Sequence, residues 1–180
     1  RVTVKSASAG MPVIQSVAPC AMFRADKCAT HITDMMDMSR CPALGVGPGI
    51  GTDDATIDAL ELLLKSRAAA TQQMVLDADA LNCIAKRTQL FNYLPVLSIL
   101  TPHPGEFDRI FGEQPSAEER LKRALEVSKF HKVIIVLKGH FTAIVRPDGK
   151  VFFNASGSAA LATPGSGDVL TGVITAFLAQ

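Results

Sequence analysis

The sequence lacks an excess of charge of either sign. Lys and Arg together number 18 and Asp and Glu 17, which gives a formal net charge of +1, and like charges form no block anywhere along the chain. Proteins that bind nucleic acid usually carry a basic patch or stripe, and this sequence shows none. We therefore expect no nucleic-acid partner.

Paired cysteines and long apolar runs are also missing. The cysteines form no Cys-x-x-Cys pair and have no spacing to histidine that suits zinc, so we interpret them as reduced, partly buried thiols. That favours the cytoplasm. No stretch approaches the roughly 18 to 20 apolar residues that a membrane helix needs, and neither an initiator Met nor a signal-peptide pattern is present. The cysteines are Cys20, Cys28, Cys41 and Cys83.

What is present is the pattern of one α/β domain over residues 1–180. Hydrophobic residues make up 48% of the 180 residues, enough for one core at about 150 residues per domain. Short runs rich in β-branched residues alternate with stretches of helical period, which predicts a mostly parallel sheet flanked by helices. The predicted strands are Val2–Val4, Ala43–Val46, Met74–Leu76, Val96–Leu100 and Val133–Leu137.

Local signals predict two of the helices between these strands. The apolar residues of Ile57–Leu64 share one helical face, and Thr52 or Asp53 is available as the N-cap. A second helix begins at Ser116, which with Glu119 has the spacing of a capping box.

The period changes near the C-terminus. Thr142–Val145 and Val151–Phe153 flank an Asp-Gly pair at Asp148 and Gly149, which predicts a β-hairpin. Residues 168–178 then have the apolar spacing of a buried helix.

The segment Gly165–Asp168 is the most informative turn. Its glycines let the backbone approach a ligand, and the helix that follows directs unpaired N–H groups and the positive end of its dipole at the turn. This predicts an anion site, beside which Asp168 could accept a proton from a hydroxyl. The alternative, that Asp168 only caps its helix, stays open on the local pattern.

Two further turns follow predicted strands. Gly47–Gly51 lies where ligands bind in open α/β sheets, but it matches neither standard nucleotide fingerprint and is equally typical of a tight strand-to-helix turn. Asp77–Asn82 holds acids and an amide that could orient a substrate or hold Mg²⁺ through water, and such residues also form turns and caps.

Two more turns complete the set. In Thr101–Glu106, prolines on both sides restrict His103, although a surface turn with a solvated imidazole is the alternative. Lys138–Thr142 could place a cation and backbone groups against a nucleotide, or form a plain β-turn. Four of the five turns follow the carboxyl ends of successive predicted strands, and those ends share one edge of a parallel sheet. The pattern therefore predicts a single cleft.

Taken in order, these five motifs resemble the ADP/ATP-dependent NAD(P)H-hydrate dehydratases, nucleotide-dependent repair enzymes with a ribokinase-like fold. The resemblance covers about Val2 to Gln180 and includes Val136–Gly139 and Gly165–Gly172 as they stand here. It implies a lyase that phosphorylates the ring hydroxyl of hydrated NADH or NADPH with ADP or ATP and Mg²⁺, after which loss of phosphate restores the double bond.

The resemblance also implies roles for individual residues. Asp168 matches the catalytic base, and it would contact the substrate together with Gly49 and His103. No direct metal ligand is assigned. The nucleotide would contact the residues that match the family's nucleotide and anion sites, which are Lys138, Gly139, His140, Phe141, Thr142, Gly165, Ser166 and Gly167.

The sequence departs from the family in several places. Pro164 stands where a small residue such as Gly is usual, and it removes one N–H from the turn, while Ser158 stands where Asn is common. Members begin with a further strand and a glycine-rich helix and continue beyond the last helix found here, so we expect a domain truncated at both ends and inactive alone. Bacterial members often carry an epimerase domain upstream, and a homo-oligomer is compatible with the family.

Two other functions remain open. A ribokinase-like kinase acting on a vitamin-type alcohol would use the Gly165–Asp168 turn equally well, although Thr101–Glu106 and Gly47–Gly51 favour the dehydratase. A nucleotide-binding module without catalysis is the third reading.

Overall fold

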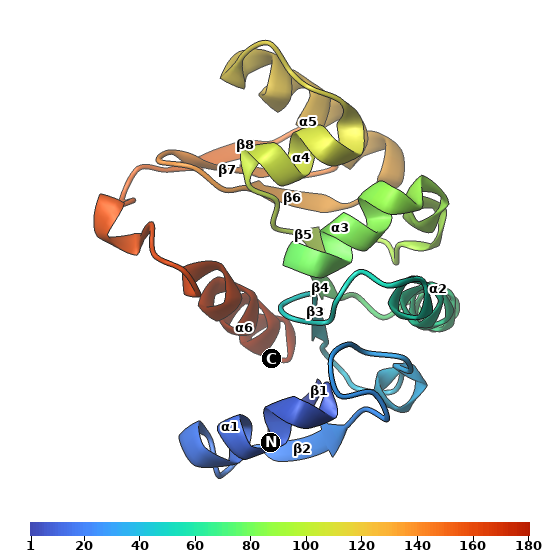
Figure 1. Cartoon of the computed structure of the whole chain (residues 1–180). Coiled ribbons are helices and arrows are strands. Elements are labelled where there is room, and N and C mark those ends of the chain that lie inside the picture. Colours follow the sequence, from blue (N-terminus) through green and yellow to red (C-terminus); the bar gives the residue numbers. More distant parts are fainter.

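The computed structural model describes residues 1–180, apart from the side chain of Ala159, and confirms an α/β architecture (Figure 1). The strands are β1 (Thr3–Ser6), β2 (Met22–Ala25), β3 (Gly45–Val46), β4 (Val75–Leu76), β5 (Ile99–Leu100), β6 (Ile134–Leu137), β7 (Thr142–Val145) and β8 (Val151–Asn154). The α-helices are α1 (Met11–Val17), α2 (Asp54–Ala69), α3 (Ala78–Lys86), α4 (Pro104–Phe111), α5 (Ala117–His131) and α6 (Ser166–Leu178).

The main sheet has six strands in the order β3-β4-β5-β6-β7-β8. β3 to β6 are parallel neighbours, and β7 and β8 extend the sheet as the predicted antiparallel hairpin. Val75 and Leu76 of β4 are fully buried, as expected for a strand covered on both faces. The strand order places the ends of β3 to β6 in one row.

The two faces of this sheet are covered differently (Figure 1). Helices α2 to α5 lie on one side, and α6 lies on the other side, against β3 and β4. The core under α2 to α4 contains Leu63, Leu81 and Phe107, each with no exposed surface. On α6, by contrast, Val169 and Phe177 are 66% and 70% exposed, so the prediction of a buried helix over residues 168–178 is wrong.

The N-terminal strand differs from its prediction. β1 pairs in parallel with β2, a strand that the sequence analysis did not predict, and the two form a separate sheet. The Val96–Leu100 run also yields only a short strand, because Leu97 has a φ of 64° and the Ser98 N–H bonds to the Pro95 carbonyl in a turn.

Two local predictions need correction. Ser116 accepts a bond from the Glu119 N–H at 3.1 Å, but Glu119 makes no return bond, so the capping box at α5 is incomplete. A complete capping box occurs at α4, between His103 and Glu106. Cys20 is exposed rather than partly buried, whereas Cys83 is fully buried, and burial raises the pKa of that thiol to about 11. None of the helices among the described residues is both long and apolar enough to cross a membrane.

Candidate functional site

Four of the five predicted turns meet at one edge of the sheet. Gly47–Gly51 follows β3, the Asp77 segment follows β4, Thr101–Glu106 follows β5, and Lys138–Thr142 follows β6. These strands are parallel neighbours, so their carboxyl ends lie side by side. The fifth turn, at the start of α6, reaches the same edge because α6 contacts both β3 and β4.

The start of α6 has the features of an anion site. Gly165 is the N-cap with a φ of 88°, a left-handed conformation that strains any other residue. The Ser166 N–H bonds to the Thr163 carbonyl at 3.2 Å, whereas the N–H groups of Gly167 and Asp168 have no backbone acceptor among the described residues. Two free N–H groups at the positive end of a helix dipole are suited to an oxyanion.

Asp168 does not cap this helix. It is the third helical residue, no side chain makes a cap bond at the α6 N-terminus, and the residue is exposed. The capping alternative therefore has no support in the observed geometry. A solvent-facing carboxylate beside two free N–H groups is available to take a proton from a bound hydroxyl.

An ion pair between buried Asp77 and partly buried Lys138 lies next to the turn. Asp77, which is 1% exposed, accepts a bond from Lys138 Nζ at 2.7 Å through Oδ1 and from Thr171 Oγ1 at 2.7 Å through Oδ2. A Cβ added to Gly167 would lie 3.6 Å from Lys138 Nζ and 3.7 Å from Asp77 Oδ2. The charged pair is therefore in van der Waals reach of the anion turn.

The His103 turn joins this cluster through Glu106. Lys138 Nζ lies 3.7 Å from Glu106 Oε2, and the same oxygen accepts the His103 N–H at 2.8 Å. His103 Nδ1 accepts the Glu106 N–H at 3.2 Å, so its ring is fixed as the N-cap of α4. The alternative of a solvated imidazole agrees with the exposure of the His103 side chain, which is 52%. It does not account for the hydrogen bonds that fix the ring.

The Gly47–Gly51 turn packs closely against Asp77. A Cβ on Gly47, which has a φ of 144°, would lie 1.8 Å from the Asp77 carbonyl oxygen, so only glycine fits. The Gly51 N–H donates to Asp79 Oδ2 at 3.0 Å. At Gly49 an added Cβ would meet nothing within 4 Å, which leaves that glycine facing open space.

A cavity of about 720 Å³ lies between β1, β3 and α6. Asp168, Gly47 and Pro48 line one part of it, and the rest is largely apolar, with Val46, Leu44 and Met35 among its lining residues. The structure thus brings Asp168 and the Gly47 turn to one cavity. Gly49 and His103 are not among its lining residues.

A side-chain hydrogen bond from Thr142 closes the Lys138–Thr142 turn. Thr142 Oγ1 donates to the Gly139 carbonyl at 3.0 Å, and the rings of His140 and Phe141 lie edge to face with centroids 4.6 Å apart. Phe141 is 61% exposed, so its ring is available for stacking on a planar ligand. Only Lys138 of this turn reaches the buried cluster.

No group of three or more His, Cys, Asp or Glu side chains that could hold a metal ion occurs among the described residues. The Asp77 and Glu106 carboxylates already face the Lys138 ammonium. The side chains thus do not fit a Mg²⁺ site built from protein alone. Mg²⁺ bound through nucleotide phosphates needs no such cage.

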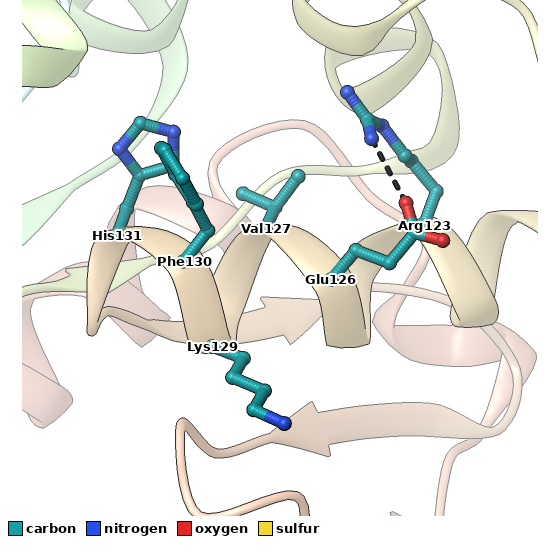
Figure 2. Close-up of a pocket in the computed structure, with 6 residues that line it drawn as sticks. All are labelled: Arg123, Glu126, Val127, Lys129, Phe130 and His131. Carbon is teal, nitrogen blue, oxygen red and sulfur yellow. Dashed lines mark hydrogen bonds and ion pairs between the residues drawn. The ribbon is translucent and has the colours of Figure 1, made fainter.

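A second hollow, of about 780 Å³, lies on α5 (Figure 2). Arg123 and Glu126 pair at one end of it at 2.9 Å, and Phe130 and His131 lie at its other end (Figure 2). Lys129 also lines the hollow, although its side chain extends in the opposite direction from the others (Figure 2). His131 ends α5 just before β6 begins, so this hollow lies near the amino end of β6. It is therefore separate from the site at the carboxyl ends.

One residue of the cluster was missed by the sequence analysis. Thr171 was not singled out, although its position three residues after Asp168 puts both on neighbouring parts of one helical surface. Its contact with Asp77 spans 94 residues of sequence, so no local pattern could indicate it. Glu106 was included only as the last residue of the Thr101–Glu106 turn.

The fold and the site define an α/β protein in which the start of α6 presents free N–H groups at the carboxyl edge of the sheet. A family model described as NAD(P)H-hydrate dehydratase matches residues 2–180. The chain belongs to the NAD(P)H-hydrate dehydratase family. A bifunctional NAD(P)H-hydrate repair enzyme from Moorella thermoacetica is 39% identical over 146 residues, covering 79% of this chain and 27% of the relative.

Solved structures agree. The ADP/ATP-dependent NAD(P)H-hydrate dehydratase from Bacillus subtilis, co-crystallised with ATP/Mg²⁺ and soaked with CoA, superposes with a TM-score of 0.78 at 33% identity, covering 99% of this chain and 63% of that one. A ribokinase-like superfamily protein from Enterococcus faecalis superposes with a TM-score of 0.80 at 26% identity, covering 99% and 61%. The fold is ribokinase-like, as predicted. The chain spans about a quarter of the Moorella relative's length.

Proposed function

We propose that the protein containing this chain is a lyase that dehydrates hydrated NADH or NADPH at the expense of ADP or ATP. The observation that carries the proposal is the start of α6, where two free N–H groups, the exposed Asp168 carboxylate and the underlying Lys138 lie together. An anion and a reacting hydroxyl can meet there. Membership of the family supports the choice of substrate.

The proposed reaction needs one base and one anion site. The ring hydroxyl gives its proton to Asp168 as its oxygen attacks the terminal phosphorus, and the bond from that phosphorus to the rest of the nucleotide breaks, leaving AMP or ADP. The ring C–O bond then breaks and phosphate leaves with its electron pair. A neighbouring ring carbon loses a proton, and the double bond forms.

The chain's own residues divide between the two ligands. We propose that Gly49, His103 and Asp168 contact the hydrated dinucleotide, which enters beside the Gly47–Gly51 turn. Mg²⁺, held by the nucleotide phosphates, would neutralise part of their charge. The residues proposed to contact the nucleotide are Lys138, Gly139, His140, Phe141, Thr142, Gly165, Ser166 and Gly167.

Within the anion turn, the free N–H groups supply the stabilisation. Those of Gly167 and Asp168 would bond to the transferred phosphate, whereas the Ser166 N–H already donates to the Thr163 carbonyl, so that any Ser166 contact would come from its side chain. Preorganised backbone donors of this kind stabilise charge as it develops in the transition state.

The direct test uses the full-length protein with the hydrate and either ADP or ATP. We expect the absorbance of the reduced nicotinamide to recover only when a nucleotide is present. If a folded full-length protein restores no absorbance with either nucleotide, the proposal is wrong. A stable phosphorylated product from a vitamin-type alcohol would instead favour the kinase alternative, which the shared fold and turn keep open.

We also propose a fused upstream domain and a cellular location for the protein, each on a single observation. The name of the Moorella relative is that of a bifunctional enzyme, which supports an upstream epimerase domain fused to this one. The absence of paired cysteines supports a cytoplasmic location. Size-exclusion chromatography with light scattering of the full-length protein would establish its mass and whether it forms a homo-oligomer.

A further inference from the structure

Asp77 stands out because it is a buried carboxylate that the proposed reaction does not use. It is 1% exposed, and each oxygen has one partner from a distant part of the chain. Oδ1 bonds to Lys138, 61 residues away, and Oδ2 bonds to Thr171, 94 residues away. The carboxylate therefore connects the end of β6 to the first turns of α6.

The backbone of Asp77 is fixed just as firmly. Its N–H donates to the Val46 carbonyl at 3.0 Å, and its own carbonyl accepts from the Ala80 N–H at 3.0 Å. The same carbonyl oxygen abuts Gly47, the residue where no Cβ fits. Asp77 is thus anchored to β3 and α3, and its side chain reaches from that anchor to α6.

Stability alone is a weak reason for such a pair. Desolvation of the buried Asp77 carboxylate and the partly buried Lys138 ammonium offsets part of their attraction, and apolar replacements of similar volume are often as stable. Geometry gives a stronger reason. Thr171 lies one helical turn beyond Asp168, so the bond from Thr171 to Asp77 holds the helix that carries the base. Lys138 is held by the same carboxylate in van der Waals reach of Gly167.

We infer that Asp77 is a positioning residue, which holds the first turn of α6 through Thr171 and the Lys138 ammonium in fixed register for phosphate transfer. The inference rests on the proposed function, because it assigns a role within that same site. Asp77 itself does not touch the reacting atoms. A displacement of about 1 Å between base and phosphate can lower turnover by about a hundredfold, so such a link matters to rate.

The test removes the link without removing charge. In the full-length protein, Thr171→Val deletes the hydroxyl that bonds to Asp77 and keeps the side-chain shape, whereas Thr171→Ser keeps the hydroxyl. We expect kcat to fall about 10- to 100-fold in Thr171→Val, with KM for the nucleotide changed less than about threefold, and to return toward the wild-type value in Thr171→Ser.

A matched control separates positioning from stability. Ser128→Ala also deletes a fully buried hydroxyl, one that bonds to the Val133 carbonyl at 2.6 Å on α5, away from the site. It should lower the free energy of unfolding and leave kcat per folded molecule unchanged. Asp77→Asn, which removes the charge, is a second variant, and it should lower kcat as well.

Hydrogen exchange of the α6 amides gives a readout that does not depend on turnover. Exchange over residues 165–172 should speed up in Thr171→Val and not in Ser128→Ala. If the wild type turns over and Thr171→Val keeps both its kcat and its exchange protection, the positioning role is wrong while the proposed function stands. If the wild type has no turnover, the proposed function fails, and exchange still reports whether Asp77 holds α6.

Discussion

The two faces of the main sheet differ in what covers them. Under α2 to α4, apolar side chains such as Leu63 and Phe107 have no exposed surface. On the other face, α6 has an exposed outer surface, and near it lie a cavity of about 720 Å³ and the ion pair of buried Asp77 with partly buried Lys138. The first face supplies the stability of the fold, and the second holds the groups that can react. Polar contacts rather than apolar packing therefore fix the site.

The largest effect is expected on the packed face. Phe107→Ala removes a fully buried ring and should lower the free energy of unfolding by about 3 to 5 kcal/mol. Phe141→Ala is the matched change at the site, where the ring is 61% exposed, and it should alter stability by less than about 0.5 kcal/mol. Denaturant unfolding of both variants checks the contrast. Equal losses would contradict the division between the packed core under α2 to α4 and the exposed side chains of the candidate site.

The next effect concerns two glycines of one turn. Gly47→Ala forces a Cβ against the Asp77 carbonyl and should cost about 2 to 4 kcal/mol. Gly49→Ala has open space and only the strain of its φ of 66°, about 1 to 2 kcal/mol. Thermal unfolding of the two variants measures the difference. A Gly49 variant as unstable as the Gly47 variant would show that the close approach to Asp77 is not the determining contact.

A smaller effect should appear in acid, in the segment before β3. Burial raises the pKa of Asp26, but hydrogen bonds from Cys28, Thr33 and Asp34 outweigh it and hold the pKa at about 2, below the ordinary 3.8. Because the folded pKa is the lower one, this carboxylate stabilises the fold above pH 3.8 and the contribution is lost as the pH falls toward 2. The loss should be about 1 to 2 kcal/mol.

The measurement is unfolding in denaturant at a series of acid pH values. The Asp26→Asn variant should show a shallower loss over that range, because it lacks the titrating group. An identical pH dependence in the variant and the wild type would show that Asp26 does not contribute to the loss of stability in acid.

The smallest expected effect is a gain in the free energy of unfolding, from a substitution in α6. Gly172 lies inside α6, where an added Cβ would meet nothing within 4 Å. Gly172→Ala should therefore raise the free energy of unfolding by about 0.5 to 1 kcal/mol through helix propensity alone. Calorimetry would detect the shift, and a loss of stability would show that α6 does not keep this helical geometry in solution.

The parts of the fold that follow from local pattern could be predicted from the sequence. The parallel strands and the hairpin followed from β-branched runs and an Asp-Gly pair, and the row of turns followed from the shared edge of a parallel sheet. β2 could not be found, because Met22–Ala25 has no alternating pattern and three of its four residues are exposed. The pairing of β1 with β2, in a sheet apart from the main one, was equally hidden.

The candidate site divides in the same way. Glycines before an apolar helix indicate the Gly165–Asp168 turn, and the position of Lys138 after a buried strand indicates that residue. The bonds that join Asp77 to Lys138 and Thr171 depend on tertiary contacts between strands and helices far apart in the chain. Sequence reasoning therefore located the turns but not the interaction that holds them together.

The most direct test of the central claim compares turnover with stability in Asp168→Asn. With the hydrate and ADP or ATP, we expect the full-length variant to lose about 10²- to 10⁴-fold in kcat while its nucleotide affinity and free energy of unfolding stay near the wild-type values. Glu118→Gln, an exposed acid in the first turn of α5, serves as the control and should change none of these. An Asp168→Asn protein that turns over within about threefold of the wild type would contradict the account.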